Sequence, residues 1–421
     1  MVIDVNQFDY NLIKLLKKLE KKDANKKPTY ADIVTAFDIE TTNIDKIQNS
    51  IMYIWQFQWG EHITIIGRYW DEFINFINRI NEMIDDELMI VTYIHNLSFE
   101  WQWLKSLLKV DDVFAIDDRK IIYFRSGHFE FRCSYIHSNM SLDKFAEKME
   151  ATHLKIKGFD YSKKRYSWTR LRKKELEYCI NDVRALVEAI SNEMNKDGDD
   201  LYSIPYTSTG YVRREFKKVL KPYQKEIRKM LPGKDVMMLL RKCFRGGNTH
   251  ANRYNANRII NNVYSYDIAS SYPSVMLMEE FPMKFTHSDN KNLWLPLKHN
   301  KALLMEIVLY DVKLINDLFG CPYLARAKCE NIVNGQFDNG RILSADSLRC
   351  WINEIDFKIL LMEYDFWYEV VDLYTAPKKK LPEEFIDLLF HMFEKKTILK
   401  GGDAYAYGKY KNMINSVYGM T

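Results

Sequence analysis

The amino-acid sequence predicts a mixed α/β fold in two to three domains, and three observations lead to that prediction. The 421 residues leave room for that many domains at roughly 100–200 residues each. Hydrophobic residues make up 47% of the chain and aromatic residues 14%, enough to fill buried cores, which excludes a wholly disordered chain. Between residues 31 and 197, strand-like runs alternate with amphipathic helical stretches, as they do in α/β domains.

The net charge and the cysteines limit the compartment and the partners. A formal charge of +4 suits a nucleic-acid enzyme whose metal-binding carboxylates offset its basic surfaces, and it equally suits an ordinary globular protein. The six cysteines contain no CxxC pair, so we expect no zinc knuckle and a reducing, cytoplasmic compartment. The start does not resemble a signal peptide and no apolar run approaches the length of a membrane span, so no membrane partner is expected.

The first 30 residues predict a basic helical extension. Within residues 10–22, leucines recur at helical spacing with lysines between them, namely Leu12, Leu15, Leu16 and Leu19. This pattern favours a solvated helix packed on one face, and a DNA- or partner-binding arm is the alternative. The polar segment 23–28 then ends the helix.

The following segment reads as strands alternating with helices. β-branched and aromatic runs predict strands at 33–40, 50–60, 62–70 and 88–96, and an amphipathic pattern predicts a helix at 71–84. Residues 195–210, rich in Gly, Asp, Ser and Pro, predict a linker. Beyond it we expect a basic helical stretch at 212–231, a strand at 261–269, a long α+β stretch and a final helix that ends on SVYGMT.

Acidic residues in the first of these strands suggest a metal site. Asp38 and Glu40 are two apart in a strand, so their side chains share one face while Phe37 and Ile39 point into the core. Two carboxylates on one face repel each other unless a cation lies between them, which favours a hard divalent metal. An exposed acidic pair without a metal is the alternative.

Two further elements carry polar residues that extend this set. A predicted strand runs into a turn that bears Tyr93, His95, Asn96, Phe99 and Glu100. Tyr178 and Asp182 are four apart on a predicted helix and so share a face. A buried tyrosine beside an exposed aspartate is the alternative reading of that pair.

Together these elements resemble the Exo I, Exo II and Exo III motifs of DnaQ-like proofreading exonucleases. The resemblance implies that four carboxylates hold two metal ions, Mg²⁺ or Mn²⁺, and that Tyr178 orients the attacking water. The four are Asp38, Glu40, Glu100 and Asp182, and Glu100 stands where the family usually has Asp. Residues that resemble those holding the single-stranded 3′ end are Tyr93, His95, Asn96 and Phe99, of which Phe99 would stack on a base.

The sequence CFRGGNTHAN (243–252) carries paired glycines beside an arginine. Glycines allow close approach of one backbone to another, and the arginine suits a phosphate, although Gly-Gly also makes an ordinary tight turn. The segment resembles the YxGG motif that family B DNA polymerases use to hold template. The resemblance implies DNA contacts for Phe244, Arg245, Gly246 and Gly247, with Phe244 in place of the usual tyrosine.

The sequence YSYDIASSYPSVM (264–276) resembles motif A of family B polymerases, DxxSLYPS. The resemblance implies that Asp267 and the Ile268 carbonyl bind the metals and that Ser270 contacts the triphosphate. It also implies that Tyr272 packs under the sugar, while Ser271 replaces the usual Leu.

KNMINSVYG (411–419) resembles motif B, KxxxNSxYG, and contributes nucleotide contacts from Lys411, Asn415 and Tyr418, which recur at helical spacing. Upstream, Lys396 and Lys400 are further phosphate candidates, with a solvated charge as the alternative.

Weaker matches point to protein priming. Residues between motifs A and B resemble the first terminal-protein insertion of protein-primed, phage-type polymerases. SLDKF resembles their (S/T)Lx2h motif, which implies contacts to single strands or terminal protein from Ser141, Leu142 and Phe145. Lys157 resembles an exonuclease-domain lysine that assists catalysis.

The resemblance to protein-primed family B polymerases of bacteriophage and organellar-plasmid type covers nearly the whole chain and divides it into five parts. These are a basic helical extension (1–30), an RNase H-like DnaQ exonuclease domain (31–197), the first part of an incomplete palm (206–280), a terminal-protein-region-like insertion (281–386) and the start of the fingers (387–421). The expected partners are template-primer DNA, a single-stranded 3′ end, deoxynucleoside triphosphates and a terminal priming protein. The expected location is the cytoplasm of a phage-infected or plasmid-bearing host cell.

A complete polymerase site also needs motif C, a DTD-like acidic pair downstream of motif B, and we find none before residue 421. We therefore expect a fragment of a longer reading frame, or a split gene whose second chain supplies the rest. Alternative functions are a stand-alone 3′–5′ exonuclease with a vestigial polymerase part, and a non-catalytic DNA-binding module.

Overall fold

The computed structural model describes residues 1–21, 28–44, 50–84, 87–154, 156, 158–268, 270–318 and 320–420. The chain forms two compact units. The first comprises Met1–Arg214 with Leu399–Met413, and the second comprises Glu215–Ile398 with Ile414–Thr421. Within the described ranges, no helix is both long and apolar enough to cross a membrane. The mixed α/β class predicted from the sequence is confirmed.

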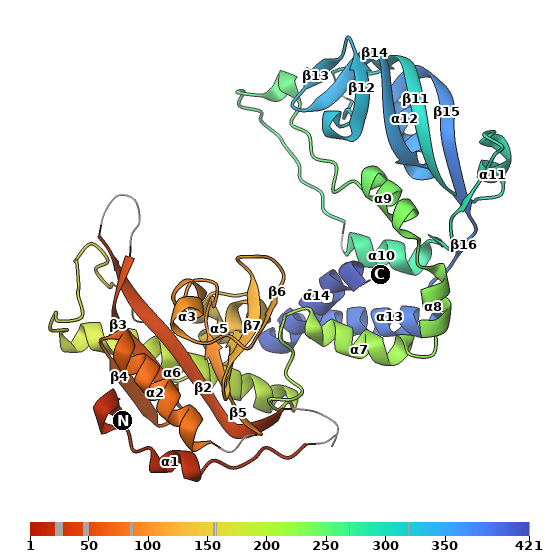
Figure 1. Ribbon diagram of the computed structural model, residues 1–421. Helices are drawn as coiled ribbons and strands as arrows, with labels where there is room; N and C mark the ends of the chain where they lie inside the picture. The colour runs from red at the N-terminus through yellow and green to blue at the C-terminus, as the bar shows by residue number, and fades with distance from the viewer. Residues whose placement is uncertain are drawn as a thin grey trace. The chain divides into compact units, whose positions relative to one another are not determined.

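The first unit is built on an eight-stranded mixed sheet in the order β1-β4-β3-β2-β5-β8-β7-β6 (Figure 1). Its strands are β1 Val2–Asp4, β2 Thr29–Asn43, β3 Ser50–Trp59, β4 Ile63–Gly67, β5 Leu88–Ile94, β6 Asp112–Ala115, β7 Ile121–Ser126 and β8 Phe129–Cys133. Strand β5 is buried along its whole length, because it lies between β2 and β8 and pairs parallel with both. Parallel strands covered on both faces are apolar throughout, which explains the uninterrupted hydrophobic run.

Helices cover both faces of this sheet. The helical elements are η1 Val5–Gln7, α1 Asn11–Lys14, α2 Trp70–Met83, α3 Trp101–Leu107, α4 Ser134–Ser138, α5 Leu142–Lys148 and α6 Lys173–Asp197. One core joins α2 to the face that carries Phe37 and Trp55, and a second joins α5 and α6 to the face that carries Ala36 and Val91. Figure 1 shows α2 and α6 on opposite sides of the sheet.

The N-terminal segment differs from the predicted helical extension. The helix expected over residues 10–22 is confined to α1, and β1 pairs with β4 at the edge of the sheet. Val5, Phe8 and Ile13 are buried in the first core. Leu12, Leu16 and Leu19 are partly buried against the cores and Leu15 is 72% exposed, so the segment packs as an irregular part of the first unit.

The predicted linker is also packed. After α6 ends at Gly198 in a left-handed conformation, Leu201 and Ile204 bury their side chains in the second core. The Tyr202 hydroxyl accepts a hydrogen bond of 2.9 Å from the Tyr30 backbone N–H. A segment rich in turn residues can thus be fixed by a few apolar anchors.

The second unit contains a six-stranded antiparallel sheet in the order β10-β15-β11-β14-β12, with β13 also paired to β14. Its strands are β10 Thr286–His287, β11 Ala302–Leu314, β12 Cys329–Val333, β13 Gln336–Asp338, β14 Arg341–Asn353 and β15 Tyr364–Ala376, and a separate pair is formed by β9 Phe281–Pro282 and β16 Lys378–Lys379. Helix α12, Glu354–Glu363, packs Phe357 and Leu360 into the core of this sheet (Figure 1).

The remaining helical elements lie along the second half of the chain. They are α7 Gly210–Leu220, α8 Gln224–Met230, α9 Lys234–Cys243, η2 Arg253–Asn255, α10 Ser271–Met278, α11 Trp294–Lys298, η3 Arg326–Lys328, α13 Glu383–Ile398, α14 Ala404–Val417 and η4 Tyr418–Met420. The basic helical stretch expected at 212–231 and the final helix are confirmed. Helices α7 and α14 contribute residues to both units.

Candidate functional site

Three carboxylates converge in the first unit. Asp38 and Glu40 lie on β2 and Asp182 lies on α6, and one ligand oxygen from each falls within 4.8 Å of the others. The two β2 residues share a face because Phe37 and Ile39 alternate with them and are buried on the other side. Close carboxylates repel one another, and a divalent cation with oxygen ligands removes that repulsion.

The negative charge of this cluster affects neighbouring groups that the sequence did not single out. Burial raises the pKa of the Cys179 thiol, and the charges of Glu40, Asp38 and Asp182 raise it further. Burial, followed by the charge of Glu40, likewise raises the pKa of the Tyr53 phenol. Both residues look like ordinary core positions in a helix and a strand, so no sequence signal marks them.

Glu100 is a buried carboxyl near the cluster. It is 3% exposed, precedes helix α3, and is outside the group of three converging carboxylates. Burial raises its pKa to about 8, and the charge of Glu40 adds to this effect. Within the described chain, its Oε2 atom is buried without a hydrogen-bond partner. A buried carboxylate oxygen without a partner is costly, so this donor set fits a divalent cation.

Tyr178 lies one helical turn before Asp182 on α6. Its hydroxyl is 2.5 Å from the hydroxyl of Tyr161, and its ring stacks on Phe159 with centroids 4.1 Å apart. Burial, the hydrogen bond with Tyr161 and the charge of Glu40 all raise the pKa of Tyr178. The phenol therefore stays protonated beside the carboxylates. The sequence analysis did not single out Tyr161, which lies four residues after Lys157. Lys157 itself lies outside the described residues.

The turn after β5 presents some of its predicted DNA contacts and hides another. Phe99 is 41% exposed, and Asn96 is exposed with a left-handed backbone (φ 64°). His95 Nδ1 lies 3.0 Å from the hydroxyl of Ser134. Tyr93 is 2% exposed and packs against α6, and its hydroxyl accepts a hydrogen bond from Arg132. The interpretation of Tyr93 as a DNA contact is therefore wrong, because a side chain of a doubly covered strand belongs to the core.

The SLDKF segment needs a similar correction. Ser141 is exposed at the start of α5, but Leu142 is 7% exposed and Phe145 is fully buried in the second core. Direct contacts from Leu142 and Phe145 to DNA or a priming protein are therefore ruled out in this conformation. The apolar spacing of the motif reflects the side of α5 that faces the sheet.

The paired-glycine segment lies beside a small basic pocket in the second unit. Its volume is about 120 Å³, and it is lined by Arg245, Gly246, Gly247, Asn248, Tyr323, Ala325, Lys328 and Arg341. The Arg245 side chain is 12% exposed, and Asp356 is its nearest acidic neighbour, with Nε and Oδ1 3.6 Å apart. In the part of the chain that is described, none of the three guanidinium nitrogens donates a hydrogen bond. A buried guanidinium with free donors suits an oxyanion.

The two glycines do not serve the backbone packing expected of them. A Cβ atom added at Gly246 or Gly247 would meet nothing within 4 Å. Phe244 is 59% exposed. The two glycines line the same pocket as Arg245. The space beside them is therefore open to a ligand and is not filled by the described backbone.

Motif A residues meet residues from the fingers segment within the second unit. Lys396 on α13 donates a hydrogen bond of 2.9 Å to the hydroxyl of Ser270, which has a left-handed backbone (φ 54°). The ring of Tyr272 lies 4.4 Å from that of Tyr418, measured between centroids. Ser271, Lys411 and Asn415 are exposed. Ser270 and Lys396 are therefore in contact, and so are Tyr272 and Tyr418, although the members of each pair are far apart in the sequence.

The strand predicted at 261–269 is absent, and Ala269 lies outside the described residues. Residues 263–268 have no regular secondary structure, and Tyr266 and Ile268 are 92% and 74% exposed. Asp267 is exposed and belongs to no three-carboxylate group within the described ranges. A run of β-branched and aromatic residues forms a strand only when a neighbouring strand pairs with it, and the described chain supplies none here.

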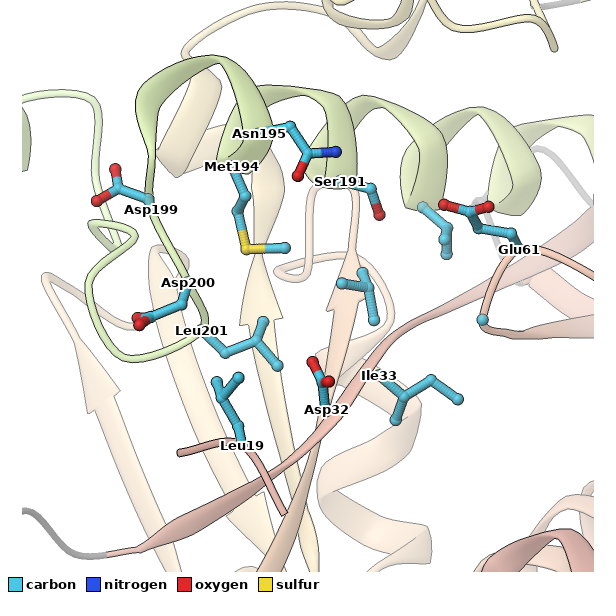
Figure 2. A pocket seen from close by; sticks show the side chains of 13 residues that line it. Leu19, Asp32, Ile33, Glu61, Ser191, Met194, Asn195, Asp199, Asp200 and Leu201 are labelled. Carbon is cyan, nitrogen blue, oxygen red and sulfur yellow. The ribbon is translucent and has the colours of Figure 1, made fainter. Parts of the chain in front are cut away.

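A separate pocket of about 380 Å³ lies between β2, α6 and the segment that follows α6 (Figure 2). Leu19, Ile33, Met194 and Leu201 give it apolar walls, and its acidic lining comes from Asp32, Glu61, Asp199 and Asp200. No residue predicted to act on DNA lines it. Its carboxylates repel a polyanion, so it does not extend the DNA-binding site.

The comparisons with known proteins agree with this arrangement. The model of the family described as DNA polymerase type B, organellar and viral, matches residues 103–421. No curated protein matches the chain. Phi29 DNA polymerase in a ternary complex with primer-template DNA and incoming nucleotide has a TM-score of 0.67 and 18% identity, over 92% of this chain and 67% of that chain. Its orthorhombic crystal form gives the same values.

A third structure, NrnC of Brucella melitensis, covers 39% of this chain and 75% of its own at 17% identity, and its TM-score of 0.26 is too low to support an argument. The likeness to Phi29 DNA polymerase establishes the fold. The family model covers well over half of the chain. The chain therefore belongs to the type B DNA polymerases of organellar and viral type, a family of DNA-directed DNA polymerases.

Proposed function

We propose that this polymerase also carries a 3′–5′ exonuclease that proofreads, and that Asp38, Glu40 and Asp182 form its metal centre. The observation that carries the proposal is the convergence of these three carboxylates within 4.8 Å, from a strand and a helix far apart in sequence. Glu100 supports it as a buried fourth carboxyl whose free oxygen would be satisfied by a cation.

The side chains around this centre have separable roles in hydrolysis. Bound divalent ions, Mg²⁺ or Mn²⁺, would activate water and stabilise the leaving 3′ oxygen. Tyr178, kept protonated by burial and by Tyr161, would hold the attacking water as a hydrogen-bond partner. Phe99, exposed at the end of the turn after β5, would stack on the terminal base.

For the polymerase reaction, we assign triphosphate binding to Ser270 and Lys396 and sugar packing to Tyr272. Lys396 already bonds to the Ser270 hydroxyl, which places a positive charge where an incoming phosphate would be held. The adjacent, exposed rings of Tyr272 and Tyr418 offer aromatic faces for the nucleotide. Arg245 with its pocket would hold a phosphate of the template strand.

Protein priming and the completion of the polymerase site are further parts of the proposal. The insertion between motifs A and B, residues 281–386, supports binding of a terminal priming protein only through its family resemblance. Asp267 stands outside the three-carboxylate group of the described residues, so we propose that the polymerase site needs a second acidic element, a motif C, to hold its metals.

Degradation of 5′-labelled single-stranded DNA tests the nuclease. The wild type should shorten the strand from its 3′ end only when Mg²⁺ or Mn²⁺ is present. The combined Asp38→Ala and Glu40→Ala substitutions should slow digestion by about a hundredfold or more, since even indirect metal contacts are worth 10–100-fold. Asp32→Ala is the matched control, because Asp32 is an exposed carboxylate on the same strand.

Equal digestion by the double variant and the wild type would refute the assignment of the metal centre. If the wild type and the double variant both bound DNA and neither degraded it, the chain would act as a DNA-binding module. Digestion without any primer extension, even when a polypeptide that carries motif C is added, would identify a nuclease with a vestigial polymerase part.

A further inference from the structure

Two free cysteines face each other at the edge of the sheet in the second unit. Cys329 is the first residue of the edge strand β12, and Cys350 lies near the end of β14. The antiparallel register places them directly opposite each other. Cys350 is buried in the sheet's core, and Cys329 packs against the same core but remains partly exposed to solvent.

This register meets the geometric requirement for a disulfide. Directly opposite residues in antiparallel strands have Cα atoms about 4.5–5.5 Å apart and side chains on the same face. A disulfide joins cysteines whose Cα atoms are about 4.4–6.8 Å apart. These two ranges of Cα–Cα distance overlap. Rotation of the side chains is therefore enough to bring the sulfur atoms together, and the strands need not move.

The surroundings also make Cys329 the nucleophile of the pair. A hydrogen bond from Cys350 lowers the pKa of Cys329, and the guanidinium of Arg245 lowers it further against the opposing effect of burial. The same hydrogen bond and burial raise the pKa of Cys350. A thiolate that solvent can reach attacks disulfides, whereas a buried thiol next to it can resolve the product.

We propose that Cys329 and Cys350 form a thiol-modification site that closes to a disulfide by exchange with a low-molecular-weight disulfide such as oxidised glutathione. The Cys329 thiolate attacks one glutathione sulfur, the S–S bond of glutathione breaks, and one glutathione thiolate leaves. Cys350 gives its proton to that thiolate and attacks the Cys329 sulfur, which releases the second glutathione. Two protein thiols are oxidised, and one oxidised glutathione is reduced to two thiols.

The position of this pair connects it to the basic pocket. Lys328, which lines the pocket with Arg245, immediately precedes Cys329 in the chain. Arg245 acts electrostatically on both thiols. A bond between β12 and β14 would thus form beside the residues that we assign to the template strand, and the chemistry of the bond itself does not depend on that assignment.

Peptide mapping of the full chain tests the proposal. The reduced protein is incubated with oxidised glutathione, its free thiols are alkylated, and it is digested without reduction. Mass spectrometry should find one linked peptide pair containing Cys329 and Cys350, and dithiothreitol should abolish it. Cys321 is exposed and provides the internal control, because its glutathione adduct shows that the oxidant reacted.

Single substitutions separate the two roles. Cys350→Ser should leave a stable glutathione adduct on Cys329, and Cys329→Ser should leave Cys350 without an adduct. Cys243→Ser should keep the linked pair, because Cys243 lies on α9 with Asp356 as its partner. A wild-type sample in which Cys321 carries glutathione while Cys329 and Cys350 are both found alkylated would overturn the proposal, whether or not the variants fold.

Discussion

At the scale of single residues, the proposed metal centre depends on how a strand divides its side chains between two faces. Phe37 and Ile39 hold β2 in the core and so fix Asp38 and Glu40 opposite Asp182. Such a fixed group of carboxylates is a source of repulsion in the absence of metal and a preformed ligand set in its presence. The centre should therefore affect stability as well as chemistry.

A metal-dependent gain in stability is the first prediction. Saturating Mg²⁺ or Mn²⁺ should raise the melting temperature of the wild type, since a ligand at a hundred times its Kd stabilises the folded state by about 2.7 kcal/mol. Combining Asp38→Asn with Asp182→Asn should abolish this gain and raise the melting temperature in EDTA, because the repulsion is removed. Differential scanning calorimetry measures both effects. Asp32→Asn should behave like the wild type, and a double variant that still gains stability from metal would contradict the assignment.

Arg245 gives a prediction about DNA affinity. If its buried guanidinium binds a phosphate, Arg245→Ala should weaken binding of single-stranded DNA. It should also lower the slope of log K against log salt concentration by about 0.7, the value for one phosphate contact on a single strand. Fluorescence anisotropy at several salt concentrations gives the slope. Arg241→Ala, an exposed arginine on α9, is the control and should change the slope less. An unchanged slope in Arg245→Ala would exclude a phosphate contact.

Single residues also show what the sequence could and could not predict. The strand period placed Asp38 and Glu40 on one face, and the helical period placed Tyr178 and Asp182 on another. That these two faces meet was implied only by the resemblance to DnaQ-like exonucleases, and the structure brings Asp38, Glu40 and Asp182 together. Neither period reveals which face of a strand or helix is covered, so Tyr93 and Phe145 were assigned to DNA although they lie in the core. The same ambiguity hid Tyr161, whose role depends on a hydrogen bond between loop and helix.

At the scale of elements, a buried ion pair ties α4 to α6 and to the segment that follows α6. His137 Nε2 lies 2.6 Å from Oε2 of Glu193, and its Nδ1 lies 2.6 Å from the carbonyl of Pro205. Burial lowers the pKa of His137, and the charge of Arg132 lowers it slightly further. The charge and hydrogen bond of Glu193, together with the hydrogen bond to the Pro205 carbonyl, raise it by more. The pKa of His137 is therefore above its ordinary value of 6.5.

The raised pKa predicts how stability changes with pH. A histidine that is more basic in the folded state contributes stability that is complete below the unfolded value of 6.5 and is lost as the pH rises through its folded value. The free energy of unfolding from urea titrations should therefore fall over this window in the wild type. His137→Gln should be less stable at low pH and lack this fall. His62→Gln, at an exposed position, is the control, and a wild-type profile that rises across the window would contradict the prediction.

The strands and helices also show where a local sequence pattern is not enough to predict secondary structure. The strands at 33–40 and 88–96 were predictable because their runs pair within the first sheet. The run at 261–269 also contains β-branched and aromatic residues and yet forms no strand over residues 263–268, because a strand needs a neighbouring strand to pair with. The leucine spacing in residues 10–22 gave a helix of only four residues, Asn11–Lys14, and the leucines are partly buried except Leu15, which is 72% exposed.

At the scale of the whole molecule, the two chemistries differ in how complete their ligand sets are. The first unit contains three converging carboxylates with a buried fourth nearby, whereas Asp267 in the second unit is exposed and stands outside such groups in the described chain. A two-metal reaction needs more than one carboxylate to hold its ions. Within the described residues, the ligand sets therefore favour the proposed hydrolysis over synthesis.

This imbalance predicts the outcome when both reactions compete. Given a labelled primer-template, Mg²⁺ and all four deoxynucleoside triphosphates, the chain should shorten the primer rather than extend it, and denaturing gels would show products below the starting length. The Asp38→Ala and Glu40→Ala double variant should leave the primer at its original length, because it removes the nuclease without adding a polymerase ligand. If that variant instead extended the primer, Asp267 would suffice for synthesis. Addition of a polypeptide that carries motif C should shift the wild type from shortening to extension if the missing ligands are the cause.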